Sequence, residues 1–250
     1  MRRREPNKRS AEDIREMRWL RTIVVFDNGN VVGQADWEAV HSSYVRSIES
    51  IDHPHGTGTL TLRRKIRLPN GQWRRNGVGY LRTCFLEHMV NTEGWQRESN
   101  VDLGRNREQP KLSLYPSGES YIEPITSDFG GFDFLTLTPA GLRVAIEWET
   151  GNISSSHRSM NKLSIALASG IVQAGVLIVP SRACYEHLTD RIGNISELSG
   201  YLELWEPART GVDRGLLAIS VVEHDALTDD EAIPYLPMGK DGLAEQGRAR

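Results

Sequence analysis

Two glutamates separated by one residue, Glu147 and Glu149, end an apolar run and precede a polar stretch in the segment VAIEWETGNISSSHR. In a β-strand alternate side chains share a face, so both carboxylates would project to one side and Trp148 to the other. Like charges this close repel each other and are costly to remove from water. The pair therefore either faces open solvent at the end of a strand or shares a cation.

A third carboxylate favours the cation. Asp133 lies fourteen residues before Glu147, in the strand-like segment FDFLTLT, and the turn PAG joins that segment to LRVAIEWE. A hairpin with this turn would bring Asp133 across from Glu147. Converging carboxylates offer the hard oxygen ligands that suit Mg²⁺, which proteins hold through one or two carboxylates together with substrate phosphate.

Hydrogen-bonding side chains follow Glu149 directly. Mg²⁺ beside a phosphodiester polarises the phosphate, lowers the pKa of a bound water and stabilises charge on the leaving oxygen. A neighbouring carboxylate accepts a proton or orients the attacking water. The combination indicates phosphodiester hydrolysis, with the following side chains facing the ligand: Asn152, Ser154, Ser155, His157 and Arg158.

The elements that must position these residues follow from the spacing of apolar residues. A strand, a crossover helix and a second strand buried on both faces predict a βαβ unit directly after the two glutamates. We expect an α/β (α+β) fold with a mixed central sheet flanked by helices. The clearest elements are helices at 36–51 (capped by Asp36), 80–90 and 154–171, and strands at 174–180 and 215–223.

Other segments are less regular. The pattern predicts a short helix from Ser10 to about Leu20, a strand at 22–26, a basic hairpin around Asn70 and Gly71, and one further helix over 184–205. We expect a single elaborated domain. Its parts would be N-terminal helices and a basic hairpin that clasp DNA or form a dimer (1–125), a catalytic core (126–225) and a loosely held tail (226–250).

Composition narrows the class of protein. The chain has 250 residues, of which 38% are hydrophobic and 25% charged, as in soluble globular proteins. No apolar run is long enough to span a membrane, the N-terminus lacks a secretory pattern, and two cysteines without CxxC spacing suit a reducing compartment, so we expect a cytoplasmic protein. A net charge of −3 argues against a global positive field, although the basic segments LRRKIR and WRRNG remain.

The ordered combination of hairpin, ExE, polar helix start and buried strand resembles the PD-(D/E)xK nucleases and, among them, the BamHI/BglII-like type II restriction endonucleases. Most of that superfamily carries lysine at the last motif position. The BamHI-like branch carries glutamate, and this chain shows Asp133 with Glu147-Trp148-Glu149. The resemblance covers about residues 132–205.

The resemblance implies roles for individual residues. Asp133, Glu147 and the Trp148 backbone carbonyl would bind the metal, and Glu149 would bind a second metal or prepare the attacking water. Asparagine suits adenine and arginine suits guanine by bidentate pairing. The residues implied to contact DNA are Asn152, Ser154, Ser155, His157, Arg158, Lys162, Ser181 and Arg182, with Glu123 as a possible additional acid.

The resemblance implies that the protein uses Mg²⁺ and no organic cofactor, that it acts on double-stranded DNA and that it does not bind a membrane. It also implies a homodimer that cuts a short palindrome, because each subunit would read one half of the site. Lys162 would reach phosphate, stand in for the displaced lysine, or be solvated. Two alternatives remain: a repair or junction-resolving nuclease without strict sequence choice, and a catalytically silent DNA-binding module whose acids are structural. Glycoside hydrolysis fits poorly, because its carboxylates come from separate elements across a sugar.

Overall fold

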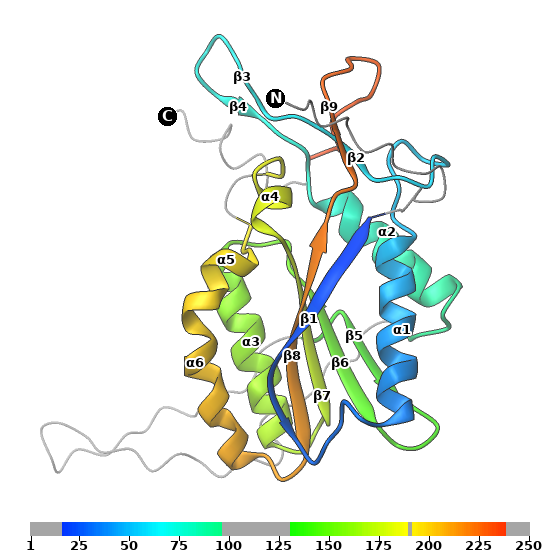
Figure 1. The fold of residues 1–250 in the computed structure, drawn as a ribbon, viewed down its shortest axis with the longest axis vertical. Coiled ribbons are helices and arrows are strands. Elements are labelled where there is room, and N and C mark those ends of the chain that lie inside the picture. Colours follow the sequence, from blue (N-terminus) through cyan, green and yellow to red (C-terminus); the bar gives the residue numbers. More distant parts are fainter. Residues whose placement is uncertain (1–16, 97–130, 190–191, 239–250) are drawn as a thin grey trace, which may run out of the picture.

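A mixed five-stranded sheet forms the centre of the molecule, with strand order β1-β8-β7-β6-β5 (Figure 1). The computed structural model describes residues 17–96, 131–189 and 192–238. Strands β6, β7 and β8 are parallel, and β1 and β5 close the two edges in antiparallel orientation, which confirms the predicted fold class. The strands are β1 (Arg18–Asn28), β8 (Gly215–Glu223), β7 (Ala174–Pro180), β6 (Arg143–Trp148) and β5 (Phe134–Leu137).

Helices cover both faces of this sheet (Figure 1). On one face α1 (Ala35–Glu49) and α2 (Gly79–Asn91) pack in one apolar cluster with Ile146 and Trp148 of β6. On the other face α3 (Ile153–Ala168) packs in a second cluster with Ala145. Because side chains alternate along a strand, Glu147 belongs to the α3 face.

Helix α1 confirms the periodicity prediction. All five residues of the predicted stripe are at most 5% exposed: Trp37, Val40, Tyr44, Ile48 and Ile51. Its start differs, because Gln34 is the N-cap and Asp36 lies in the first turn. The predicted helix through Leu20 is wrong at its described end, since β1 begins at Arg18 and its exposed edge pattern is that of a strand.

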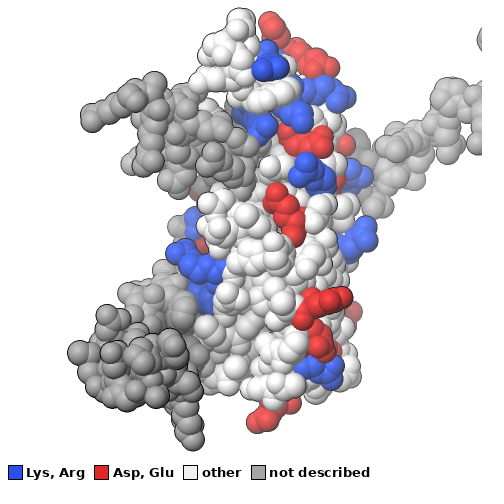
Figure 2. Space-filling view, turned by 90° about the vertical axis from the view of Figure 1, so that its left-hand side faces the viewer, with Lys and Arg blue, Asp and Glu red and all other residues white. Residues whose placement is uncertain are grey.

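The basic hairpin is confirmed around its turn. Strands β3 (Ile66–Arg67) and β4 (Trp73–Arg74) pair in antiparallel orientation, and β2 (Thr61–Arg63) pairs instead with β9 (Ala226–Thr228). On the face that Figure 2 shows, Lys and Arg side chains gather toward the hairpin end with acidic ones among them, and the middle is largely uncharged.

The C-terminal region departs from two predictions. Residues 226–238 are packed rather than loosely held, because β9 pairs with β2 and Leu236 is 1% exposed. The single helix expected over 184–205 is broken, and Asn194 restarts it by accepting hydrogen bonds from the Ser196 and Glu197 N–H groups. The pieces, with the turns that flank them, are α4 (Arg182–Tyr185), α5 (Ile195–Leu198), η1 (Ser199–Tyr201), α6 (Leu202–Trp205) and η2 (Glu206–Gly211).

Within the described ranges, none of the helices combines the length and the apolar character needed to cross a bilayer.

Candidate active site

The β5–β6 hairpin places Asp133 beside the end of β6. Phe134 pairs with Ile146, so Asp133 stands one residue beyond the ladder, opposite Glu147. The Asp133 carboxylate accepts a hydrogen bond from the Trp148 N–H at 2.8 Å and a second one from the Arg82 guanidinium of α2. The backbone and a cation therefore hold this carboxylate against the strand that carries the glutamates.

Glu147 is buried, with 8% of its surface exposed, and it forms an ion pair with Lys162 of α3. Burial raises the pKa of Glu147 to about 7, because a charged carboxylate loses hydration there. Lys162 opposes this shift, and the nearby charges of Asp133 and Glu149 add to it. The three carboxylates are thus close enough to interact electrostatically.

Glu149 follows β6 directly and is 4% exposed. Its N–H donates to the Ile178 carbonyl at 2.9 Å, which continues the pairing with β7, and its carboxylate accepts from the Gly151 N–H at 2.5 Å. Burial raises the pKa of Glu149, and the hydroxyl of Ser156, which faces the carboxylate, partly offsets this rise. Within the described part of the chain, Glu149 Oε2 is buried without a hydrogen bond of normal geometry.

Lys162 lies inside the site rather than on the surface. It is 7% exposed, its Nζ donates to the Gly131 carbonyl at 2.6 Å, and the ammonium lies 4.6 Å from the centre of the Phe132 ring. An enclosed ammonium paired with Glu147 is poorly suited to the predicted contact with DNA phosphate, and the solvated reading is wrong. The position agrees with the alternative that Lys162 supplies the site with its lysine.

The polar residues after Glu149 lie at the start of α3, next to the carboxylates. Asn152 is the N-cap, and its side chain accepts from the Ser155 N–H at 3.1 Å. Ser154 and Arg158 are exposed, whereas Ser155 is half-buried. These side chains are therefore brought together at one helix end.

His157 has a different environment. Its ring packs edge-on against Tyr201 and tilted against Trp205, with ring centroids 4.5 and 5.4 Å apart. These contacts tie α3 to the segment around α6. The imidazole thus has a packing role that accounts for its position without DNA.

Ser181 and Arg182 come directly after β7, just as Glu149 comes directly after β6. Ser181 is 8% exposed, caps α4 by accepting from the Cys184 N–H at 3.0 Å, and donates to Glu223. Its hydroxyl is committed to these internal partners. Arg182 is exposed, with its guanidinium 4.9 Å from the Tyr185 ring centre. Glu123 lies outside the described residues.

Sequence reasoning missed two residues that contact the carboxylates. Arg82 comes from the opposite helical layer and lies 51 residues before Asp133, and nothing in its local pattern connects the two. Ser156 was detectable, because it is a fully buried hydroxyl within the apolar face of α3. Gly193 accommodates that hydroxyl, since a Cβ there would lie 1.9 Å from Ser156 Oγ.

The family model "Restriction endonuclease BamHI" matches residues 17–243. The type II restriction enzyme OkrAI of Oceanobacter kriegii is 31% identical over 228 residues, which cover 91% of this chain and 99% of that enzyme. The type II restriction enzyme BamHI of Bacillus amyloliquefaciens is 36% identical over 171 residues, covering 68% of this chain and 69% of that enzyme.

These matches extend well beyond the segment 132–205 that carries the D…ExE pattern, and they include the N-terminal layer of α1 and α2. A family model that covers most of the chain and a relative aligned over nearly its whole length show common descent of the entire fold. The chain belongs to the BamHI family of type II restriction endonucleases, enzymes that cleave DNA at specific sites.

Proposed function

We propose that this chain cuts both strands of DNA at a short palindrome, as a homodimer that uses Mg²⁺. The observation that carries the proposal is the meeting of Asp133, Glu147 and Glu149 at the carboxyl end of β6. Restriction endonucleases of this family use a divalent metal. The choice of Mg²⁺ rests on the donor set, which is all oxygen.

The residues present fit such an ion. We assign Asp133, Glu147 and the Trp148 carbonyl as its ligands. In a strand the N–H and C=O of one residue point to the same side, so the Trp148 carbonyl points the same way as the N–H that Asp133 accepts. The unsatisfied Oε2 of Glu149 adds a buried acceptor beside this set.

Each residue then has a distinct task. The ion, when bound, polarises the scissile phosphate and stabilises charge on the leaving oxygen. Glu149 orients the attacking water and accepts its proton, because its buried carboxylate holds a proton more readily than an exposed one. Lys162 keeps a positive charge at the site from α3, whereas most of the superfamily carries its lysine at the last motif position, which is Glu149 in this chain.

Sequence choice is assigned to the exposed side chains beside the site. Asn152, Ser154 and Arg158 surround the start of α3 and would read base edges, and exposed Arg182 would add a further contact after β7. Ser155 and His157 would stay in supporting positions, because one is half-buried and the other packs on aromatic rings.

The decisive experiment incubates purified protein with phage DNA and Mg²⁺. Discrete fragments support site-specific cleavage, a smear would indicate a nuclease without sequence choice, and retarded but intact DNA would indicate a silent binding module. Glu149→Gln should abolish cutting while binding persists, whereas Glu87→Gln, at an exposed acid on α2, should change neither. Retained cutting with lost binding would contradict the role of Glu149.

Two further variants separate reading from phosphate contact. Arg158→Ala should change the pattern of sites cut, and Arg209→Ala, at a surface arginine paired with Glu206, should leave that pattern intact. Equal weakening by Arg158→Ala on every sequence would make that residue a phosphate contact only. Analytical ultracentrifugation of the protein should give the mass of a dimer. A complex of one protein chain with DNA that is cut in both strands would exclude the two-fold arrangement.

A further inference from the structure

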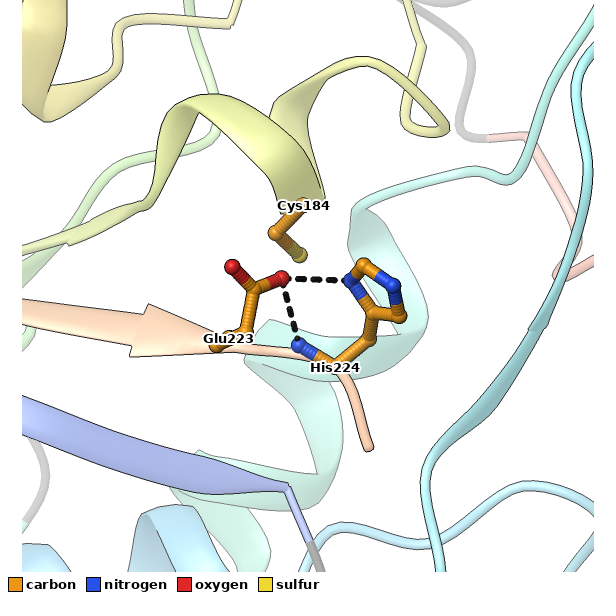
Figure 3. A group of neighbouring side chains, drawn as sticks. All are labelled: Cys184, Glu223 and His224. Atoms are coloured by element: carbon orange, nitrogen blue, oxygen red, sulfur yellow. Dashed lines mark hydrogen bonds and ion pairs between the residues drawn. The ribbon is translucent and has the colours of Figure 1, made fainter. Parts of the chain in front are cut away.

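A separate group of side chains of the types that can bind metal ions lies at the same edge of the sheet, two strands away from β6. Cys184 comes from α4, and Glu223 and His224 come from the end of β8. Figure 3 shows the Cys184 thiol pointing at the Glu223 carboxylate, beside the His224 ring. One ligand atom from each residue lies within 4.8 Å of the other two, and among the described residues this is the one group with that property.

The group is enclosed. Cys184 has no exposed surface, and His224 and Glu223 are 8% and 9% exposed. A thiolate, an imidazole and a carboxylate together suit Zn²⁺, whereas Mg²⁺ and Ca²⁺ take oxygen ligands and do not select a sulfur. The chemistry of this group therefore differs from that of the all-oxygen site at Glu147.

We propose that Cys184, Glu223 and His224 bind one Zn²⁺ ion, with a water molecule as the fourth ligand. Bond lengths of about 2.0–2.3 Å in a tetrahedral site place ligand atoms roughly 3.3–3.8 Å apart. The present span of up to 4.8 Å closes with small side-chain movements. Glu223 Oε1 and His224 Nδ1 are 2.5 Å apart, so one of these two side chains must rotate slightly to admit the ion.

Binding requires the Cys184 thiol to release its proton to solvent. The proton that His224 Nδ1 donates to Glu223 moves to Nε2, so the S–H bond and this N–H bond are the bonds broken. A further imidazole, that of His187, has its ring centroid 5.8 Å from that of His224. Its Nδ1 accepts the Lys65 backbone N–H at 3.2 Å, so its proton is on Nε2. That tautomer excludes His187 as a ligand through Nε2, which is why the fourth position goes to water.

The position of the group points to a structural task. Ser181 caps α4 through the Cys184 N–H and also donates to Glu223, so one hydrogen-bonded unit already joins α4 to the end of β8. An ion on the same carboxylate and on Cys184 fixes that junction. The exposed Arg182, within the first turn of α4, is thereby held in place for DNA.

The competing reading is a buried hydrogen-bonded cluster without metal, in which Ser181 and the His224 N–H satisfy Glu223. Titration with Co²⁺, a spectroscopic substitute for Zn²⁺, separates the two. A cobalt–thiolate charge-transfer absorption should appear in the wild type at one ion per chain and persist in excess Mg²⁺. Its absence, or its displacement by Mg²⁺, would overturn the proposal.

Variants identify the ligands. Cys184→Ser should remove the thiolate absorption, and His224→Gln should weaken Co²⁺ and Zn²⁺ affinity at least tenfold. Cys84→Ser is the matched control, because Cys84 is the other thiol, half-buried on α2, and outside the group. An absorption kept in Cys184→Ser or lost in Cys84→Ser would refute the assignment. Circular dichroism verifies that each variant folds, and no arm of the experiment depends on DNA cleavage.

Discussion

Replacing Lys162 by methionine tests the electrostatics of the acidic site. The ammonium is 7% exposed and pairs with Glu147, which is 8% exposed, so neither charge is well hydrated. Removing one partner of a buried pair typically costs about 3–5 kcal/mol, because the other charge stays buried and unpaired. Methionine retains most of the apolar length of lysine, which limits the contribution of lost packing.

The loss should depend on pH. In the wild type burial raises the pKa of Glu147 from 4.5 to about 7, so the unfolded chain releases this proton first as pH rises. Glu147 therefore lowers the free energy of unfolding by about 3 kcal/mol across that window. Without Lys162, only Asp133 and Glu149 would face Glu147, both charges would raise its pKa further, and the decline would continue above pH 7.

The magnitude follows from this further rise in the pKa of Glu147. Each additional unit corresponds to about 1.4 kcal/mol of lost stability. The deficit of Lys162→Met relative to the wild type should thus be at least about 1 kcal/mol larger at about pH 8.5 than at about pH 5, where Glu147 is protonated in both proteins.

Urea unfolding in the presence of a chelator measures this difference. Lys65→Met is the control, because Lys65 lies 3.8 Å from Glu186 with both side chains partly exposed, and it should cost less than about 1 kcal/mol at either pH. The double variant Lys162→Met with Glu147→Gln should lose the pH dependence. An equal deficit of Lys162→Met at both pH values would refute this account of the site.

Three further predictions concern stability. Phe85→Ala should cost about 3–5 kcal/mol in urea unfolding, because the ring is fully buried, and a loss under about 1 kcal/mol would contradict that packing. Gly77→Ala should destabilise by about 1–3 kcal/mol, since the new Cβ would lie 1.9 Å from the Pro237 carbonyl oxygen; unchanged stability would mean that the C-terminal segment is loosely held. Mg²⁺ at ten times its Kd should stabilise the wild type by about 1.4 kcal/mol, and Glu147→Gln should remove most of this gain.

The elements that the sequence predicts well are those in which apolar residues recur at regular spacing because one face, or both faces, of the element lie in the core. The α1 stripe from Trp37 to Ile51 keeps one face in the core, and β7 is apolar throughout because both faces of the sheet are covered. Apolar spacing predicts one helix over 184–205 because it continues across the break before Asn194. The side chain of Asn194 caps the start of a new helix there, and apolar spacing alone does not register such a cap.

The same distinction explains the site. Asp133 and Glu147 are joined by a short hairpin, so their approach follows from local chain geometry. The Arg82 contact requires α2 to pack beside β5, which depends on the whole N-terminal layer. Contacts between residues far apart in the sequence leave no periodic pattern around either residue. The sequence alone predicts such contacts only through comparison with relatives that share the entire fold.

Burial sets both the chemistry and the cost of this site. Glu147 and Glu149 are buried at the carboxyl end of β6 in an apolar sheet, so the surroundings that raise their pKa values also oppose folding with both groups charged. Lys162 of α3 offsets part of that opposition at Glu147, and Arg82 of α2, on the opposite face of the sheet, balances the charge of Asp133. Because each cation contacts a different carboxylate, the two helical layers are coupled through the acids, and a shift of either layer changes the charge balance at the position assigned to the scissile phosphate.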